Sequence, residues 1–239
     1  MYLIITMAGL YQRFEDFSLN VPKYLLPYKS RSIFFWVLKN YSNYNFKKII
    51  LIINKRDISF INLINEDLKN LRIKNFEKIL IENTSSQIET THVGLNIIKT
   101  KIEEKHAIVV TNVDTILINR NFKIYKNLMK KYDCVVDIFE SNNKSYSYVL
   151  FDKKNNLINF KEKVVISNSA SSGLYIFKNI NLLKDLVKKA QNSKNRYFSE
   201  LIYSMIKSKY KVTHNNLDKK KHTIVLGTPE EYLSELQKN

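Results

Sequence analysis

The sequence has few residues that cross-link a chain or interrupt regular structure. Its 239 residues include one cysteine, four glycines and three prolines. A single cysteine excludes a disulfide framework and a cysteine metal site within the chain. Cys134 lies in an apolar run, residues 133–138, which predicts an inert thiol on a buried strand. Because glycine and proline are so scarce, each one is expected to mark a position with a special backbone requirement.

Long apolar runs are also missing. No stretch approaches the roughly 20 apolar residues that a membrane-spanning helix needs. The apolar opening, residues 1–7, has no basic lead and is too short for a signal peptide. We therefore expect a cytoplasmic protein that has no membrane partner. The length and a hydrophobic content of 44% predict one domain over residues 1–239.

Arginine is scarce among the basic residues, although the formal net charge is +17. So high a charge first suggests a protein that binds nucleic acid or a membrane surface. However, only six of the 39 basic residues are arginine, the residue that reads phosphates and base edges with a planar pair of donors. The lysines are scattered, as on solvated faces. We therefore expect no nucleic-acid partner, and a basic surface that attracts polyanionic substrates such as triphosphates.

Strand-like and helix-like segments alternate through the first two thirds of the chain. The strand-like segments are short, β-branched and bounded by polar residues, as buried parallel strands are: residues 2–6, 48–53, 78–82 and 107–111. Apolar residues at helical spacing lie between them, in residues 32–43, 57–71 and 90–101. This alternation predicts an α/β fold of Rossmann-like type, a mostly parallel mixed sheet flanked by helices. Ligands of such sheets bind at the carboxyl ends of the strands.

The pattern changes from Asp133 onward. Strand-like segments with polar turns between them predict a small antiparallel β-meander over residues 133–139, 145–151 and 157–162. After it we expect strands at residues 171–177, 210–214 and 223–226 and helices at residues 181–190 and 198–208. A closing helix is expected up to Leu236, with Thr228 as N-cap and Pro229 at its first position.

A glycine-containing loop follows the first predicted strand and reads Met7-Ala8-Gly9-Leu10-Tyr11-Gln12-Arg13-Phe14. Small residues at the end of a strand let backbone N–H groups approach phosphate oxygens, and Arg13 can add a fork of donors. Taken alone, the loop is better explained as a tight turn that binds no ligand. Lys23 follows between Pro22 and Pro27 on the same rim, where its point charge suits a triphosphate.

The order of short motifs resembles the sugar-phosphate nucleotidyltransferase family. That family opens with a strand, a glycine-containing loop that ends in arginine, and a lysine flanked by prolines, as residues 1–27 do here. Similar blocks continue through the whole chain, at residues 83–95, 111–114, 159–163, 170–177, 198–202 and 226–232. Several blocks in the right order and spacing are far more specific than any one of them.

The resemblance implies transfer of the NMP part of a nucleoside triphosphate to a small phosphorylated metabolite, with release of pyrophosphate. The attacking phosphate oxygen is already an anion, so alignment and charge neutralisation suffice and no general base is required. By resemblance, Arg13 and Lys23 hold the triphosphate and Asp114 binds the cofactor Mg²⁺. The other implied contacts are, for the nucleotide, Ala8, Gly9, Leu10, Tyr11, Thr84, Ser86, Gln87 and Asn112, and, for the acceptor, Glu162, Lys163 and Gly173. Residues 1–132 would then bind the nucleotide and residues 133–239 the acceptor.

The sequence departs from the family pattern at four positions. Tyr11 replaces the second glycine of the opening loop, so the loop either takes another path or uses the tyrosine to cover the nucleotide. Val225 stands where the family often has an aspartate, which removes a second metal ligand. Ser86 replaces a glycine near the base, and Val164 replaces a proline after Glu162-Lys163.

Some of these residues also have purely structural interpretations. Asp114, after a buried strand, can cap a turn. Glu162 and Lys163 can form a solvated turn. The aromatic run at residues 33–36 predicts core packing rather than a base-stacking platform. The four histidines lack the spacing of metal ligands.

Other functions compete with nucleotidyl transfer. A glycosyltransferase with a related sheet would show D-x-D after the central strand, whereas Asn112-Val113-Asp114 lacks the first aspartate. A catalytically silent nucleotide-binding module would explain the changes at residues 11 and 225. A nucleic-acid binder would be retained on heparin with a steep salt dependence.

The substrates are only partly determined. The Met-Ala-Gly opening and residues 87–90 look more like the cytidylyl and uridylyl branches, which favours CTP or UTP. A hexose 1-phosphate is the default acceptor, while phosphocholine or another phosphorylated alcohol or amine stays open. Either product would feed the synthesis of a surface polysaccharide such as capsule or lipopolysaccharide. The sequence predicts no oligomeric state.

Overall fold

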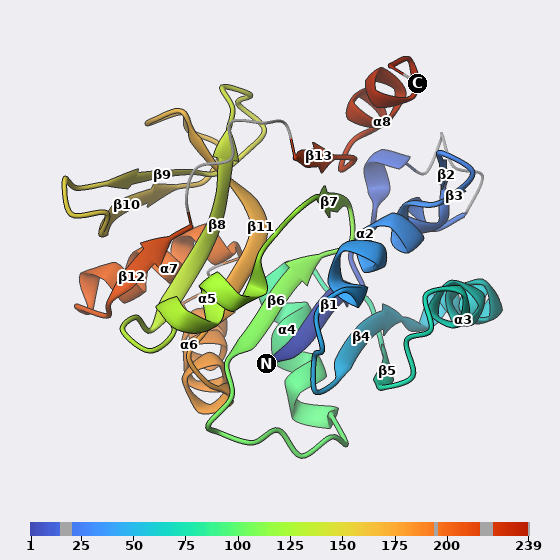
Figure 1. The fold of residues 1–239 in the computed structure, drawn as a ribbon, viewed down its shortest axis with the longest axis horizontal. Helices are drawn as coiled ribbons and strands as arrows, with labels where there is room; N and C mark the ends of the chain where they lie inside the picture. The colour runs from blue at the N-terminus through green and yellow to red at the C-terminus, as the bar shows by residue number, and fades with distance from the viewer. Residues whose placement is uncertain (15–20, 194–195, 216–221, 239) are drawn as a thin grey trace.

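Parallel strands form one half of a nine-stranded sheet (Figure 1). The computed structural model of the chain describes residues 1–14, 21–193, 196–215 and 222–238. In it, β1 (Tyr2–Met7) lies between β4 (Ile49–Asn54) and β6 (Ile108–Asn112), and β5 (Phe76–Ile81) pairs with β4. Every residue of β1 and β4 is buried, because helices cover both faces. The predicted α/β class is confirmed, and these strands lie within two residues of their predicted ends.

The strand order determines where a ligand site can open. β6 follows β5 in the sequence but lies on the other side of β1. The order therefore reverses between β1 and β6. In sheets of this kind a crevice forms at the carboxyl ends of the strands where the order reverses. The opening loop follows β1 and Asp114 follows β6, so both lie at this crevice.

Helices contribute to a separate core on each face of the sheet. On one side are α2 (Ile33–Ser42), α3 (Ile61–Asn70), α5 (Phe122–Leu128) and α8 (Pro229–Leu236). On the other are α4 (Gln87–Ile97), α6 (Ile180–Asn192) and α7 (Phe198–Lys207). Successive residues of a strand face opposite sides, so Leu3 enters the first core and Ile4 the second. None of the helices in the described ranges is long and apolar enough to cross a membrane.

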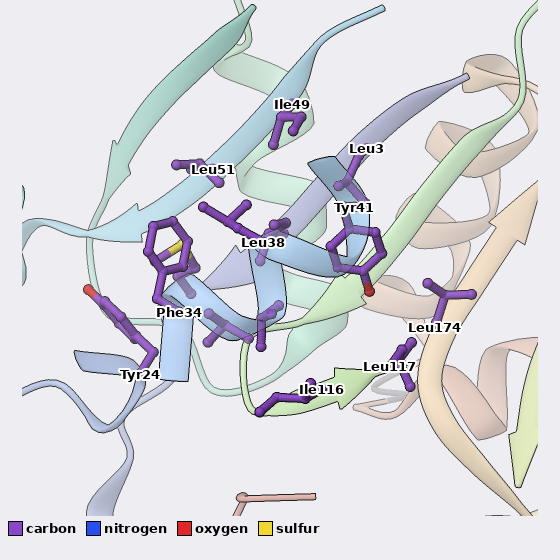
Figure 2. Close-up of a cluster of buried hydrophobic side chains, with 14 of the residues drawn as sticks. Leu3, Tyr24, Phe34, Leu38, Tyr41, Ile49, Leu51, Ile116, Leu117 and Leu174 are labelled. Atoms are coloured by element: carbon purple, nitrogen blue, oxygen red, sulfur yellow. The ribbon is translucent and has the colours of Figure 1, made fainter. Parts of the chain in front are cut away.

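The first core is built on the apolar side of α2. Phe34 and Leu38 lie over the strands that carry Leu3 and Leu51 (Figure 2). All four side chains are completely buried. Burying a side chain of this size contributes about 1.5–3 kcal/mol to stability. Core packing is therefore confirmed for Ile33 and Phe34 and, partly buried against the core, for Trp36, but Phe35 is not part of this core.

The antiparallel half of the sheet is confirmed, but its strand order is not that of a simple meander. β11 (Ser169–Phe177) stands between β8 (Cys134–Glu140) and β6 and is antiparallel to both. β9 (Tyr148–Phe151) also pairs with β11, and β10 (Leu157–Lys161) forms a hairpin with β9. β12 (Val212–His214) extends the sheet beyond β8. Turn signals in the sequence locate strand ends but do not report that a later strand inserts between earlier ones.

Helix caps explain where the observed boundaries differ from the predicted ones. The helix expected from residue 90 begins at Gln87, because the Ser86 hydroxyl accepts a hydrogen bond from the Glu89 N–H at 3.1 Å. The helix expected from Asp57 begins as a 3-10 turn, Lys55–Phe60, and continues as α3. The short α5 and β7 (Thr115–Leu117) were not predicted.

Two buried polar groups lie in β8. The predicted burial of Cys134 on a strand is confirmed, and this burial raises the pKa of its thiol well above the ordinary value. Asp137 is completely buried and pairs with Arg120 at 3.0 Å (Nε to Oδ1). Tyr125 and Asn215 also donate hydrogen bonds to it, the latter at 2.6 Å. These donors compensate the burial of the charge.

Candidate active site

A cleft of about 570 Å³ opens at the carboxyl ends of β1 and β6. A second cavity, of about 190 Å³, lies against β11 and shares Gln87, Asn112 and Tyr146 with the cleft. Most of the residues predicted for nucleotide and metal line the cleft: Gly9, Leu10, Tyr11, Arg13, Lys23, Thr84, Ser86, Gln87, Asn112 and Asp114. Ala8 is fully buried and is not part of the lining.

The opening loop keeps a glycine-type turn although it carries a tyrosine. Tyr11 has a φ of +37°, in the left-handed region that favours glycine. Its carbonyl accepts a hydrogen bond from the Phe14 N–H at 2.8 Å, which closes the 3-10 turn Gln12–Phe14. Phe14 is fully buried and anchors the turn, while Arg13 stays exposed at the cleft. The Tyr11 hydroxyl donates to Asp57 at 2.7 Å.

Lys23 enters the cleft from a second 3-10 turn, Lys23–Leu25, which follows Pro22. Tyr24 and Leu25 are buried and fix this turn. The Lys23 ammonium forms an ion pair with the Asp114 carboxylate, and the two side chains are 20% and 15% exposed. The residues assigned by resemblance to the triphosphate and to the metal are thus in direct contact.

The C-terminal part of the chain lies beside Asp114. β13 (Thr223–Val225) pairs with β7, and Val225 is opposite Thr115. The Leu226 N–H donates to the Asp114 carbonyl oxygen at 2.8 Å. Position 225, where the family often has an aspartate, is therefore next to Asp114 but supplies no carboxylate.

A second carboxylate that the sequence analysis missed is close by. The point where a β-carbon on Gly227 would lie is 3.4 Å from an oxygen of Asp114 and 3.4 Å from an oxygen of Glu231. Glu231 accepts hydrogen bonds from the N–H groups of Gly227 and Thr228, both at 3.0 Å, and from the Tyr146 hydroxyl at 2.6 Å. Burial, and then this bond, raise the pKa of Tyr146, so its hydroxyl keeps its proton. In the sequence, the pattern Thr228-x-x-Glu231 is that of a capping box and could have identified Glu231.

The predicted base contacts lie near the start of α4. Ser86 caps the helix through its hydroxyl. The Gln87 side-chain amide donates to the Thr6 hydroxyl at 3.1 Å. The Thr84 hydroxyl oxygen is 2.6 Å from that of Thr90. These contacts hold the side chains in fixed orientations along the cleft wall.

The smaller cavity is lined mainly by polar side chains. Its serines are Ser145, Ser147, Ser171, Ser172 and Ser199. Glu162 lies in its wall and accepts hydrogen bonds from Ser147 and, at 2.7 Å, from Ser199. Ser172 Oγ and Asn112 Oδ1 are buried and have no hydrogen-bond partner among the described residues. Buried polar atoms without partners are costly, so these two are suited to binding a polar ligand.

The other two predicted acceptor residues are placed differently. Gly173 has a φ of +82°, and a β-carbon there would lie only 2.6 Å from Asn112 Nδ2. The space beside this glycine is therefore filled by the Asn112 side chain. Lys163 is exposed and lines neither cavity. Its ammonium lies 5.3 Å from the ring centre of Tyr197, which lines both, so Lys163 is at the rim.

A comparison with protein-family models shows to which family the chain belongs. The nucleotidyl transferase family model matches residues 3–235. The chain belongs to this family. The enzyme class implied by the motifs is therefore confirmed for this nucleotidyltransferase. A search of curated proteins finds no match to it.

Solved structures share the fold of the nucleotidyltransferase. A nucleoside-diphosphate-sugar pyrophosphorylase from Vibrio cholerae RC9 has a TM-score of 0.85 at 23% identity, over 98% of this chain and 99% of that one. A UDP-glucose pyrophosphorylase complexed with UDP-glucose has a TM-score of 0.78 at 16% identity, over 99% and 97%. The inositol-1-phosphate CTP transferase from T. maritima has a TM-score of 0.73 at 11% identity, over 99% and 94%. At these identities the likeness is one of fold.

Proposed function

We propose that this nucleotidyltransferase joins the NMP part of a nucleoside triphosphate to a sugar phosphate and releases pyrophosphate. One observation carries the proposal: the cleft that contains Arg13, Lys23 and Asp114 shares a wall with a cavity lined by hydroxyl groups. The first part suits a triphosphate and the second a sugar. The two pyrophosphorylases of the same fold, named for nucleotide sugars, support this product class.

The reaction requires charge neutralisation rather than acid–base chemistry. An acceptor phosphate oxygen would attack the α-phosphorus, and the bond from that phosphorus to the oxygen bridging to the β-phosphate would break. The attacking oxygen is already ionised, so no base has to remove a proton. Arg13 and Lys23 are the cations of the cleft lining in the described part of the chain. They would bind the triphosphate and stabilise the negative charge that develops on the leaving pyrophosphate.

Asp114 is the residue that would hold Mg²⁺. Mg²⁺ is usually bound through one or two carboxylates, with substrate phosphates and waters completing its shell, and the cleft offers such a donor set. Asp114 is available once Lys23 binds the triphosphate, and Glu231 lies across Gly227 from it. Bound there, Mg²⁺ would neutralise charge on the α-phosphate.

The polar cavity supports a sugar as the body of the acceptor. The unpartnered oxygens of Ser172 and Asn112 and the carboxylate of Glu162 would bind sugar hydroxyls. Lys163, at the rim, is our candidate for the acceptor's phosphate. The nucleotide would then be bound by residues 1–132 and the acceptor by residues 133–239.

We further propose CTP or UTP as the donor, on the likeness of the opening loop and of residues 87–90 to the cytidylyl and uridylyl branches. A nucleotide sugar made from either in the cytoplasm would serve the synthesis of a surface polysaccharide.

The products distinguish this function from its rivals. The enzyme is incubated with Mg²⁺, one NTP at a time and a panel of hexose 1-phosphates, and the products are identified by mass spectrometry. We expect a nucleotide sugar and pyrophosphate from one combination. A glycosyltransferase would consume a nucleotide sugar and release a nucleoside phosphate, and a silent module would bind NTP without forming a product. Either result would contradict the proposal.

A further inference from the structure

The loop that carries Arg13 and the turn that carries Lys23 are both tied to one buried carboxylate, Asp57. The Tyr11 hydroxyl donates to Asp57 Oδ1 at 2.7 Å. The Tyr24 hydroxyl donates to Asp57 Oδ2 at 2.9 Å. The Asp57 side chain is only 1% exposed. Each carboxylate oxygen thus accepts a hydrogen bond from one tyrosine, and a single group joins two segments of the cleft.

Arg56, the neighbour of Asp57, adds a second set of contacts to the opening loop. Its Nη2 donates to the Gly9 carbonyl oxygen at 2.6 Å, and its Nε donates to the Tyr11 hydroxyl oxygen at 3.1 Å. Its guanidinium carbon lies 3.9 Å from the ring centre of Tyr11. Its Nε is also 3.4 Å from Asp57 Oδ1, so Arg56 neutralises the buried carboxylate while it binds the loop.

These contacts account for a tyrosine in a turn that favours glycine. A residue with a side chain rarely adopts the positive φ that Tyr11 has. Glycine would permit the turn but would leave it free to move. Tyr11 keeps the same turn and fixes it, because its ring and its hydroxyl are both held from Arg56 and Asp57.

We propose that Arg56 and Asp57 are positioning residues for the triphosphate. Neither lines the cleft, so they act through Tyr11 and Tyr24. Asp57 fixes the spacing between Arg13 and Lys23 before the nucleotide arrives, and cations held in place need not be reordered on binding. The inference rests on the proposed function, because that function assigns both cations to the triphosphate. A displacement of about 1 Å in such a site can reduce the rate roughly 100-fold.

Substitution of tyrosine by phenylalanine removes the hydroxyl and keeps the ring. Tyr24→Phe loses the hydrogen bond to Asp57, and Tyr11→Phe loses the hydrogen bond to Asp57 and the one donated by Arg56. The test measures the Kd of Mg-CTP and of Mg-UTP by isothermal titration calorimetry, without an acceptor. We expect Tyr11→Phe and Tyr24→Phe each to raise the Kd, and the double variant to raise it about tenfold or more. Asp57→Asn keeps one acceptor oxygen, so it should raise the Kd by no more than the double variant does. Added to the double variant, it should change the Kd by less than about twofold, because both changes remove the same connection.

Tyr125→Phe is the matched control. The Tyr125 hydroxyl also donates to a buried carboxylate, that of Asp137, and neither residue lines the cleft. We expect it to lower thermal stability as the loop variants do and to leave the nucleotide Kd unchanged. If Asp57→Asn does not fold, the phenylalanine variants still decide the question.

The outcomes separate this inference from the function on which it rests. A folded Tyr11→Phe/Tyr24→Phe variant with the wild-type Kd would overturn the positioning role and leave nucleotidyl transfer intact. A wild-type protein that binds neither nucleotide, and none of the other NTPs, would overturn both.

Discussion

Asp114 and Lys23 neutralise each other in the structure, although each is assigned a different ligand. Both side chains are partly exposed, and ion pairs of this kind contribute little to stability. Their contact keeps the cation of the turn and the carboxylate after β6 close together, and in the proposed function the triphosphate would bind Lys23 and Mg²⁺ would bind Asp114. Substitutions at either residue should therefore affect activity far more than folding.

Lys23→Ala tests the triphosphate assignment. We expect kcat/KM to fall about 100-fold or more, which corresponds to ~3 kcal/mol of lost transition-state stabilisation. The melting temperature should change little. Lys39→Ala is the control, since the Lys39 ammonium lies over the Trp36 ring, 4.5 Å from its centre, and Lys39 does not line the cleft. An unchanged kcat/KM in Lys23→Ala would show that other residues bind the triphosphate.

Val225→Asp tests the environment of Asp114. Position 225 is paired with Thr115, next to Asp114, so the new carboxylate would provide a second ligand. We expect the affinity for Mn²⁺, used as a probe in the absence of nucleotide, to rise by roughly tenfold, because affinity for such ions depends on the number of charged ligands. Val225→Asn has a similar size without the charge and should bind as the wild type does. Equal Mn²⁺ affinity in all three proteins would place the metal away from Asp114.

At the scale of elements, capping groups set where the helices of the site begin. The Ser86 hydroxyl caps α4, and Thr228 with Glu231 forms a capping box at α8. Both caps lie in the cleft lining. The start of each helix and the shape of the site are therefore determined by the same side chains.

Ser86→Ala removes the first of these caps. We expect the free energy of unfolding to fall by ~1 kcal/mol, measured by urea denaturation. The KM for the nucleotide should rise, because Gln87 follows the cap directly and lines the cleft. Ser86→Thr keeps the hydroxyl and should retain both values. A Ser86→Ala variant with lowered stability and an unchanged KM would separate this helix start from nucleotide binding.

The sequence predicted those elements and residues that can be recognised from a short stretch of neighbouring residues. The mostly apolar runs of β1 and β4 and the motif residues Arg13, Lys23 and Asp114 are of this kind. By contrast, α5 and β7 are too short to show a periodicity. The place of β11 depends on pairing between distant segments. Asp57 had no assigned role, because its contact with Tyr11 joins residues 46 positions apart. Glu231 has a local capping-box pattern, but its contact with Tyr146 joins residues 85 positions apart.

For the whole molecule, two partly buried histidines, His106 and His214, predict how stability depends on pH. Burial, and then the nearby Lys47, lower the pKa of His106. Burial lowers the pKa of His214, against a smaller opposite effect of the hydrogen bond that its Nδ1 donates to the Asn215 carbonyl oxygen. The unfolded chain therefore binds protons at these residues at higher pH than the folded chain does.

We expect the melting temperature to fall as the pH is lowered through about 6.5, the ordinary histidine pKa, toward the lowered pKa of the folded state. Above this window neither imidazole is charged, so the two make no pH-dependent contribution there. Thermal melts at intervals from pH 8 to pH 5.5 measure the effect. His214→Gln should show a shallower decline. A variant with the same slope as the wild type would exclude His214 as a cause.

At the same scale, the cleft and the polar cavity adjoin at the carboxyl end of one sheet, and in the proposed function they would place two substrates side by side. The nucleotide and the acceptor would contact different halves of the chain and meet near Asn112, which lines both spaces. Neither substrate alone fills the site. The reaction should therefore depend on both at once.

Pyrophosphate release is the most direct test of this account. The wild-type enzyme is assayed with Mg²⁺ in four mixtures: CTP or UTP alone, a hexose 1-phosphate alone, both together, and neither, with Asp114→Asn assayed in parallel. We predict release only when a nucleotide and a sugar phosphate are both present, and a strong loss of it in Asp114→Asn. Equal release from the nucleotide alone, or none with any nucleotide and sugar phosphate pair, would contradict nucleotidyl transfer to a sugar phosphate.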